Sequence, residues 1–263
     1  EENIPELKIP ADTSASPEEG SDSGKPSRSS KTSLNSPEGL FVTDEGDIYI
    51  ADTENQRIVV CDINGKVSKV YQKIEISVLG DNYSFKPTKL VVDNTGTLQL
   101  VCSGINRGIV QITSDGEFEK FFGAPDVVIS FWQRIWRNFA TEEQLAQMST
   151  FSPTEYSNLT IDDRGFIYPT ISALDEAAVK ALKQLSVASS YAPVKKLSAD
   201  GTDMLRRKGL AAPMGDLTWA EGENTNPKIV DISVDSESGR YTILDQQTGR
   251  FFTYDADGNM LYL

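Results

Sequence analysis

The sequence predicts an all-β protein built from repeated four-stranded blades, a β-propeller, on three observations. A proline-led segment of about 40 residues recurs four times along the chain. Each copy contains four short runs rich in Val, Ile, Tyr, Phe and Leu, which are the lengths and residue types of β-strands. Each copy also carries two turn glycines, and these are Gly46, Gly96, Gly165 and Gly239, then Gly65, Gly116, Gly201 and Gly258. Blades arranged around an axis bury each other's faces, so repetition of this unit predicts a propeller.

Four blades can be placed. The first covers about residues 36–85, with the runs "LFVTD", "DIYIAD", "RIVVCD" and "VSKVY" as its strands. The others cover about 86–123, 152–209 and 226–263. The two turn glycines of a copy are 19, 20, 36 and 19 residues apart, so the third copy carries an insertion.

Two segments have helical rather than strand periodicity. Within residues 126–149, Trp132, Ile135, Trp136 and Phe139 follow the spacing of one helix face, and "TEEQ" predicts a capping box for a second short helix. Residues 172–187 have a helix pattern inside the third blade. We expect both insertions to lie over one end of the propeller.

The first 35 residues differ from the rest. The stretch "ADTSASPEEGSDSGKPSRSSKTS" is acidic and rich in Ser and Pro, which predicts a flexible loop, while "IPELKIP" fits a partial outer strand. Because the chain opens without Met and without a signal segment, we expect a removed leader or a fragment.

Composition excludes some functions. The net charge is −14, and no Lys/Arg cluster exceeds "LRRKG" at 205–209, so nucleic-acid binding is not expected. The absence of histidine removes the commonest general base and zinc ligand.

No apolar stretch has the length of a membrane span, so any membrane attachment would use segments absent from this chain. Cys61 and Cys102 read as buried small hydrophobes, with a disulfide as the alternative.

The stretch "DEGDIYIADTENQRIVVCDINGK" resembles an NHL repeat. The matching positions are Pro37, Asp44, Gly46, Tyr49, Ile50, Asp52, Asn55, Arg57, Ile58, Asp62 and Gly65. The second copy matches in part, and the third and fourth fall in register. More narrowly, residues 36–263 are similar to NHL-repeat proteins of Gram-positive gut bacteria. This resemblance implies a six-bladed propeller, of which four blades are recognised here, and a secreted or membrane-anchored protein.

Candidate functional residues follow from the repeats and the insertions. In NHL blades, residues like Asp52, Asn55 and Arg57 form a structural clasp across a turn. Trp132 and Trp136 would either form an apolar ligand shelf or pack their helix onto the blades. Tyr156 and Asn158 lie directly beyond that insertion, and we expect them to offer polar groups to a sugar or peptide at the same end.

The expected function is a non-catalytic, extracellular or cell-surface binding platform for a protein or carbohydrate ligand, without a cofactor. The alternative is a metal-dependent hydrolase of the lactonase type, whose propellers hold a divalent ion with a Glu, Asn and Asp set. In this chain the corresponding candidates are Glu38, Asn158 and Asp231. Zinc lyases of the peptide-amidating kind are excluded because they need histidine.

Overall fold

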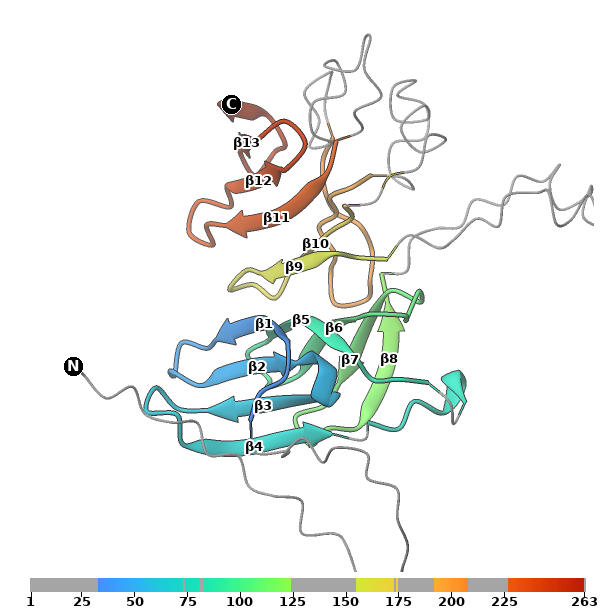
Figure 1. Cartoon of the computed structure of the whole chain (residues 1–263). Helices are drawn as coiled ribbons and strands as arrows, with labels where there is room; N and C mark the ends of the chain where they lie inside the picture. Colours follow the sequence, from blue (N-terminus) through green and yellow to red (C-terminus); the bar gives the residue numbers. More distant parts are fainter. Residues whose placement is uncertain are drawn as a thin grey trace, which may run out of the picture. The chain divides into compact units, whose positions relative to one another are not determined.

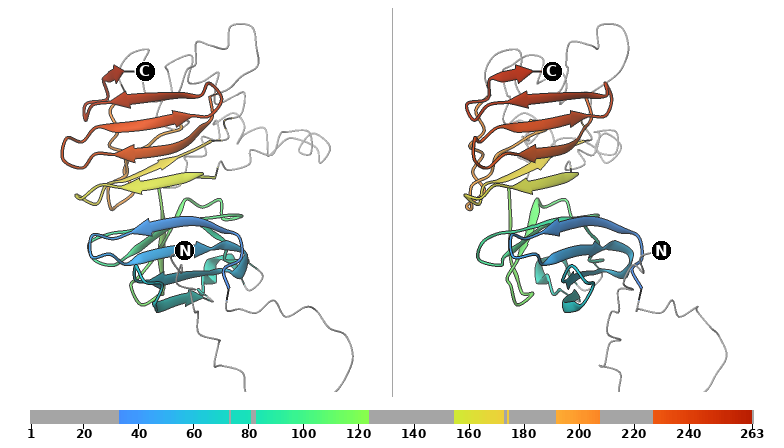
Figure 2. Two further views of the ribbon diagram at one scale, coloured as in Figure 1. Left: turned by 60° about the vertical axis from the view of Figure 1, so that its left-hand side comes forward. Right: turned by 90° about the vertical axis from the view of Figure 1, so that its left-hand side faces the viewer.

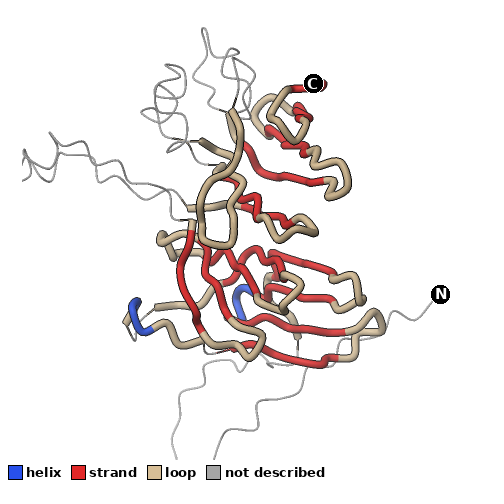
Figure 3. The backbone as a smooth tube through the Cα atoms, turned by 180° about the vertical axis from the view of Figure 1, so that it is seen from behind, coloured by secondary structure: helices blue, strands red, loops and turns tan. Residues whose placement is uncertain are grey.

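A computed structural model describes residues 33–72, 74–80, 83–123, 155–172, 174, 192–207 and 227–262. These residues form 14 β-strands and two short 3-10 helices, which confirms the all-β prediction (Figure 3). The chain divides into two compact units, residues 1–104 with 111–120 and residues 105–110 with 121–263. The predicted insertions 126–149 and 172–187 lie outside the described residues, apart from Ser172 and Leu174.

The first two blades are four-stranded antiparallel sheets in which each strand pairs with the next along the chain (Figure 1). The first contains β1 (Pro37–Val42), β2 (Ile48–Asp52), β3 (Arg57–Cys61) and β4 (Val67–Gln72), with the 3-10 helix η1 (Thr53–Asn55) between β2 and β3. The second contains β5 (Pro87–Val92), β6 (Leu98–Cys102), β7 (Ile109–Ile112) and β8 (Phe118–Phe122), and η2 (Ser77–Leu79) precedes it.

The second unit contains a complete sheet and a reduced one (Figure 2). The complete sheet is β11 (Ile229–Val234), β12 (Tyr241–Asp245), β13 (Arg250–Tyr254) and β14 (Met260–Tyr262). The reduced sheet pairs β9 (Asn158–Ile161) with β10 (Ile167–Thr170). Here the sequence predicted four strands. Among the described residues the outer half forms isolated bridges, namely Ile167–Leu197, Thr170–Val194 and Leu197–Asp203. Pro169 lies in β10 and Pro193 in the facing segment, and a proline removes an N–H from the ladder.

One turn design closes several hairpins and explains the repeated Asp–Gly signal. Between β5 and β6, Asp93 Oδ1 accepts backbone N–H groups from Thr95 at 2.8 Å and Thr97 at 3.1 Å. Asp62, Asp162 and Asp255 hold their turns in the same way. The glycine three residues after the Asp has a positive φ, +79° at Gly96, which glycine adopts without a steric penalty.

The core of each unit lies between blade faces. In the first unit β1 approaches β5 so closely that a Cβ on Gly39 would lie 2.5 Å from the Thr88 carbonyl oxygen. In the second unit the core includes three buried tyrosines. Tyr241 and Tyr254 stack with ring centroids 5.2 Å apart, and Tyr168 lies 6.3 Å from Tyr241. Blade-to-blade packing of this kind follows from strands with apolar residues on both faces.

Both cysteines are free and buried, as the simpler interpretation of the sequence expected. Burial raises the pKa of the Cys61 and Cys102 thiols. In the part of the chain that the structure describes, no helix is long and apolar enough to cross a membrane.

Candidate functional site

The residues expected to form a clasp are in direct contact. Asp52 is fully buried, and its Oδ2 accepts hydrogen bonds from Arg57 Nε at 2.7 Å and Asn55 Nδ2 at 2.8 Å. Arg57 Nη2 and Asn55 Nδ2 also donate to the Ser33 carbonyl, at 3.1 and 2.9 Å. Asp52 Oδ1 accepts the Asn35 N–H at 2.6 Å. The clasp therefore fastens residues 33–35 to the turn after β2, and its polar groups form hydrogen bonds within the chain.

The same register position carries aspartate in two of the four sheets and other residues in the remaining two. Asp52 pairs with Pro37 at the start of β1, and its equivalents opposite Pro87, Asn158 and Ile229 are Cys102, Thr170 and Asp245. Asp245 repeats the capping role, because its Oδ1 accepts the Lys228 N–H at 2.9 Å and its Oδ2 accepts the Thr248 hydroxyl at 3.1 Å. Burying a carboxylate is costly unless donors surround it, and these hydrogen bonds offset that cost.

Of the four residues expected to bind a ligand, the structure describes Tyr156 and Asn158. Trp132 and Trp136 lie outside the described residues. Tyr156 is 4% exposed, and its hydroxyl donates to the Gly123 carbonyl. The Tyr156 hydroxyl is therefore already engaged in a hydrogen bond within the chain. Asn158, by contrast, is only partly buried and begins β9.

Asn158 meets Asp231 across neighbouring blades, where β9 and β11 lie side by side (Figures 1 and 2). Asn158 Nδ2 donates to Asp231 Oδ1 at 2.6 Å and to the Val230 carbonyl at 3.4 Å. The Leu159 N–H binds Asn158 Oδ1 at 2.9 Å, and the Ile232 N–H binds Asp231 Oδ1 at 2.8 Å. Both side chains are therefore fixed by backbone donors as well as by each other. We call Asn158 and Asp231 the inner-strand pair.

A bulge helps to present Asp231. In all three four-stranded sheets the register shifts just after the first strand begins, and in β11 the shift falls between Ile229 and Asp231. A bulge of this kind bends a strand and re-aims the side chain next to it. Asp231 is exposed, and among the described residues its Oδ2 makes no hydrogen bond or ion pair. The inner-strand pair can thus offer a fixed carboxylate acceptor to an external N–H or O–H donor.

Two members of the alternative metal set are in contact with each other. Asn158 and Asp231 are together, whereas Glu38 belongs to the other unit, where its carbonyl accepts a hydrogen bond from Lys89 Nζ at 2.6 Å. Within the described ranges, no group of three or more His, Cys, Asp or Glu side chains is placed to hold a metal ion.

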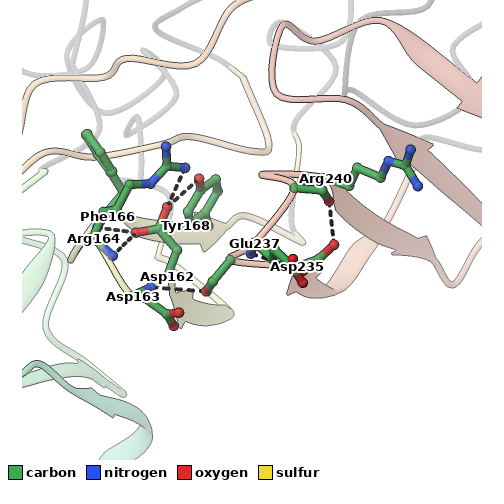
Figure 4. A network of polar contacts seen from close by, with 10 residues as sticks. Asp162, Asp163, Arg164, Phe166, Tyr168, Asp235, Glu237 and Arg240 are labelled. Carbon is green, nitrogen blue, oxygen red and sulfur yellow. Dashed lines mark hydrogen bonds and ion pairs between the residues drawn. The ribbon is translucent and has the colours of Figure 1, made fainter.

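A polar network at the β9–β10 turn was not predicted from the sequence (Figure 4). Asp162 has a fully buried side chain, and Arg164 Nη2 and the Tyr168 hydroxyl donate to its Oδ2 at 3.2 and 3.1 Å. The Asp163 N–H donates to Ser236 Oγ at 3.1 Å in the next blade. The turn signal "DDRGF" was visible, but the partner residues in the next blade are over 70 positions away.

The fold and the clasp define the class: these up-and-down, four-stranded antiparallel sheets are blades of the β-propeller type. Residues 34–61 also match the family model of the NHL repeat. That range contains the clasp residues and the first three strands of the first blade.

Comparison with solved structures gives distant likenesses, each covering 86% of this chain. A streptogramin B lyase has 13% identity and a TM-score of 0.47, and the match covers 53% of it. A protein of unknown function from Bacteroides caccae has 9% identity and a TM-score of 0.49, with 65% covered. The extracellular domain assigned to a hybrid two-component system of B. thetaiotaomicron has 13% identity and a TM-score of 0.44, with 23% covered. The chain thus spans less than two thirds of each. A sequence search of curated proteins gave no match.

Proposed function

We propose that this chain is a non-catalytic binding platform that works outside the cytoplasm or at the cell surface. Its ligand is a carbohydrate or protein segment that donates hydrogen bonds to the inner-strand pair. The observation that carries this proposal is the exposed Asp231 carboxylate on β11. It is held in place by the Asn158 side chain of the neighbouring strand β9 and by the Ile232 N–H.

Preorganisation supports binding at this pair. A side chain that is already held in place loses little conformational entropy when a ligand arrives, so more of the interaction energy remains as affinity. Each charge-assisted hydrogen bond contributes about 1.5–3 kcal/mol when it is shielded from water. Sugar hydroxyls and backbone N–H groups both supply suitable donors, and β9 and β11 are both edge strands of their sheets.

The extracytoplasmic part of the proposal comes from the sequence resemblance to secreted and membrane-anchored NHL-repeat proteins. A rigid propeller suits that role because its strands fix a site that the ligand does not need to assemble. The binding role rests on the inner-strand pair, since a fold alone does not specify a ligand.

A thermal-shift screen tests this function. The chain is heated with a panel of neutral glycans, and separately with Ca²⁺, Mg²⁺, Mn²⁺ and Zn²⁺. A ligand that binds only the folded state raises the melting temperature by mass action. We expect a shift with a glycan, lost in Asp231→Ala and retained in Glu237→Ala, an exposed acidic residue of the same unit.

Two results would overturn the proposal. A shift with a metal ion that is reversed by chelator and accompanied by lactone turnover would favour the hydrolase. A glycan shift of equal size in Asp231→Ala would remove the inner-strand pair from the site. If no glycan shifts the protein, pull-down with immobilised wild type and Asp231→Ala decides whether a protein is bound through the same carboxylate. A protein retained equally by both would also contradict the proposal.

A further inference from the structure

Two cationic side chains lie over one aromatic ring at the turn end of the third blade. The Lys196 ammonium nitrogen is 4.4 Å from the centroid of the Phe166 ring, and the Arg164 guanidinium carbon is 5.7 Å from it. Lys196 Nζ also lies 5.2 Å from the Tyr168 ring centroid. Phe166 packs against the hydrophobic core of its unit, so the ring is a fixed platform. Cations are attracted to ring faces at these distances.

The acids next to these cations are already engaged. Asp162 accepts hydrogen bonds from the Arg164 and Phe166 N–H groups, from Arg164 Nη2 and from the Tyr168 hydroxyl (Figure 4). The Asp203 carboxylate accepts from two backbone N–H groups, and from Arg207 at 2.8 Å. The Asp203 carboxylate is therefore already engaged by three donors. No ion pair or hydrogen bond of the Lys196 ammonium is formed within the described part of the chain.

The environment of Lys196 is unfavourable for its own charge. Burial lowers the pKa of the ammonium, the neighbouring Arg164 charge lowers it further, and Asp162 acts in the opposite direction. Two like charges held over one ring also repel each other. This is all the more notable in a chain with a net charge of −14.

We propose that Arg164, Phe166 and Lys196 form a binding site for the carboxylate group of a small ligand. The planar guanidinium of Arg164 is 56% exposed at its side chain, and it uses one terminal nitrogen on Asp162. Its other N–H groups match the two oxygens of a carboxylate, and the Lys196 ammonium supplies a second charge. This site is separate from the inner-strand pair and stands whether or not that pair binds a ligand.

The test is a titration of the whole chain with glucuronate and with acetate, followed by ligand-observed NMR. Glucose serves as the neutral partner of glucuronate. We expect saturable binding of both carboxylates and none of glucose under the same conditions. Lys196→Gln and Arg164→Gln should each weaken binding roughly tenfold, because each removes a charged hydrogen-bond donor. Lys196→Arg keeps the charge and should retain binding.

Controls separate the site from general effects of charge and folding. Lys228→Gln removes an exposed lysine of the same unit and should leave the affinity unchanged. Asp231→Ala, which tests the proposed function, should not alter carboxylate binding either. Because Arg164 also pairs with Asp162, each variant is first checked for a cooperative melting transition. Folded Lys196→Gln with the affinity of the wild type would overturn this site, and so would equal binding of glucose and glucuronate.

Discussion

At the scale of single residues, the buried carboxylates hold the blades' turns. Asp52 and Asp162 have no exposed side-chain surface, yet each is saturated with donors from a few residues away along the chain. Such groups stabilise a structure only as complete sets, because removing one partner leaves another buried and unpaired. The clasp is therefore expected to be sensitive to single substitutions.

Asp52→Ala should lower the free energy of unfolding by about 3–5 kcal/mol, since it removes the carboxylate that pairs with the buried Arg57 charge. Urea denaturation followed by circular dichroism measures this change. Glu54→Ala is the matched control, because it breaks the solvent-exposed ion pair with Lys86 and should cost less than about 1 kcal/mol. Equal losses in both variants would contradict a stabilising clasp.

At the scale of elements, the first strands of neighbouring blades must approach closely. Gly39 permits this in the first unit, because its missing Cβ would collide with the Thr88 backbone of β5. The position needs a small residue for contact between strands. The turn glycines such as Gly96 differ, since their positive φ is the reason for glycine there.

Gly39→Ala should therefore destabilise the chain by about 1–3 kcal/mol through overpacking against backbone atoms that cannot move independently. The unfolding midpoint in urea, compared with wild type, measures it. Leu40→Ala in the same strand removes a side chain that is 65% exposed, and its effect should stay within about 0.5 kcal/mol. A Gly39→Ala variant as stable as Leu40→Ala would mean that the two strands can separate without cost.

The elements also show what sequence reasoning could reach. Repeated turn glycines and short apolar runs predicted the sheets, because these signals are local. In the described part of the third blade, residues 192–207 pair through isolated bridges rather than as regular strands, because Pro169 and Pro193 remove N–H groups from the ladder. Asn158 and Asp231 were chosen from their places in first strands. Their mutual contact spans 73 positions, and packing between blades is not encoded in a local pattern. The approach of Lys196 to Phe166 was missed for the same reason.

At the scale of the whole molecule, the two cysteines report on the folded state of the first unit. Both thiols are buried and have raised pKa values, so they should not react with a thiol reagent in the native protein. We expect labelling to appear with the loss of native circular dichroism as urea is increased. Rapid labelling of one thiol without urea would show local opening of its blade. Cys61→Ser and Cys102→Ser identify which thiol reacts.

The stacked tyrosines of the second unit have a consequence for how the molecule's unfolding can be watched. Burial raises the pKa of Tyr168, Tyr241 and Tyr254 above the usual value near 10. The folded unit thus keeps these phenols protonated, and the stability they contribute is full below the unfolded pKa and is lost as the pH rises through the folded one. In alkali, their ionisation will coincide with collapse of that unit and will appear as tyrosinate absorbance in the ultraviolet. The chain thus carries two kinds of native reporter group, the cysteine thiols in one unit and the three buried phenols in the other, and neither requires an engineered residue.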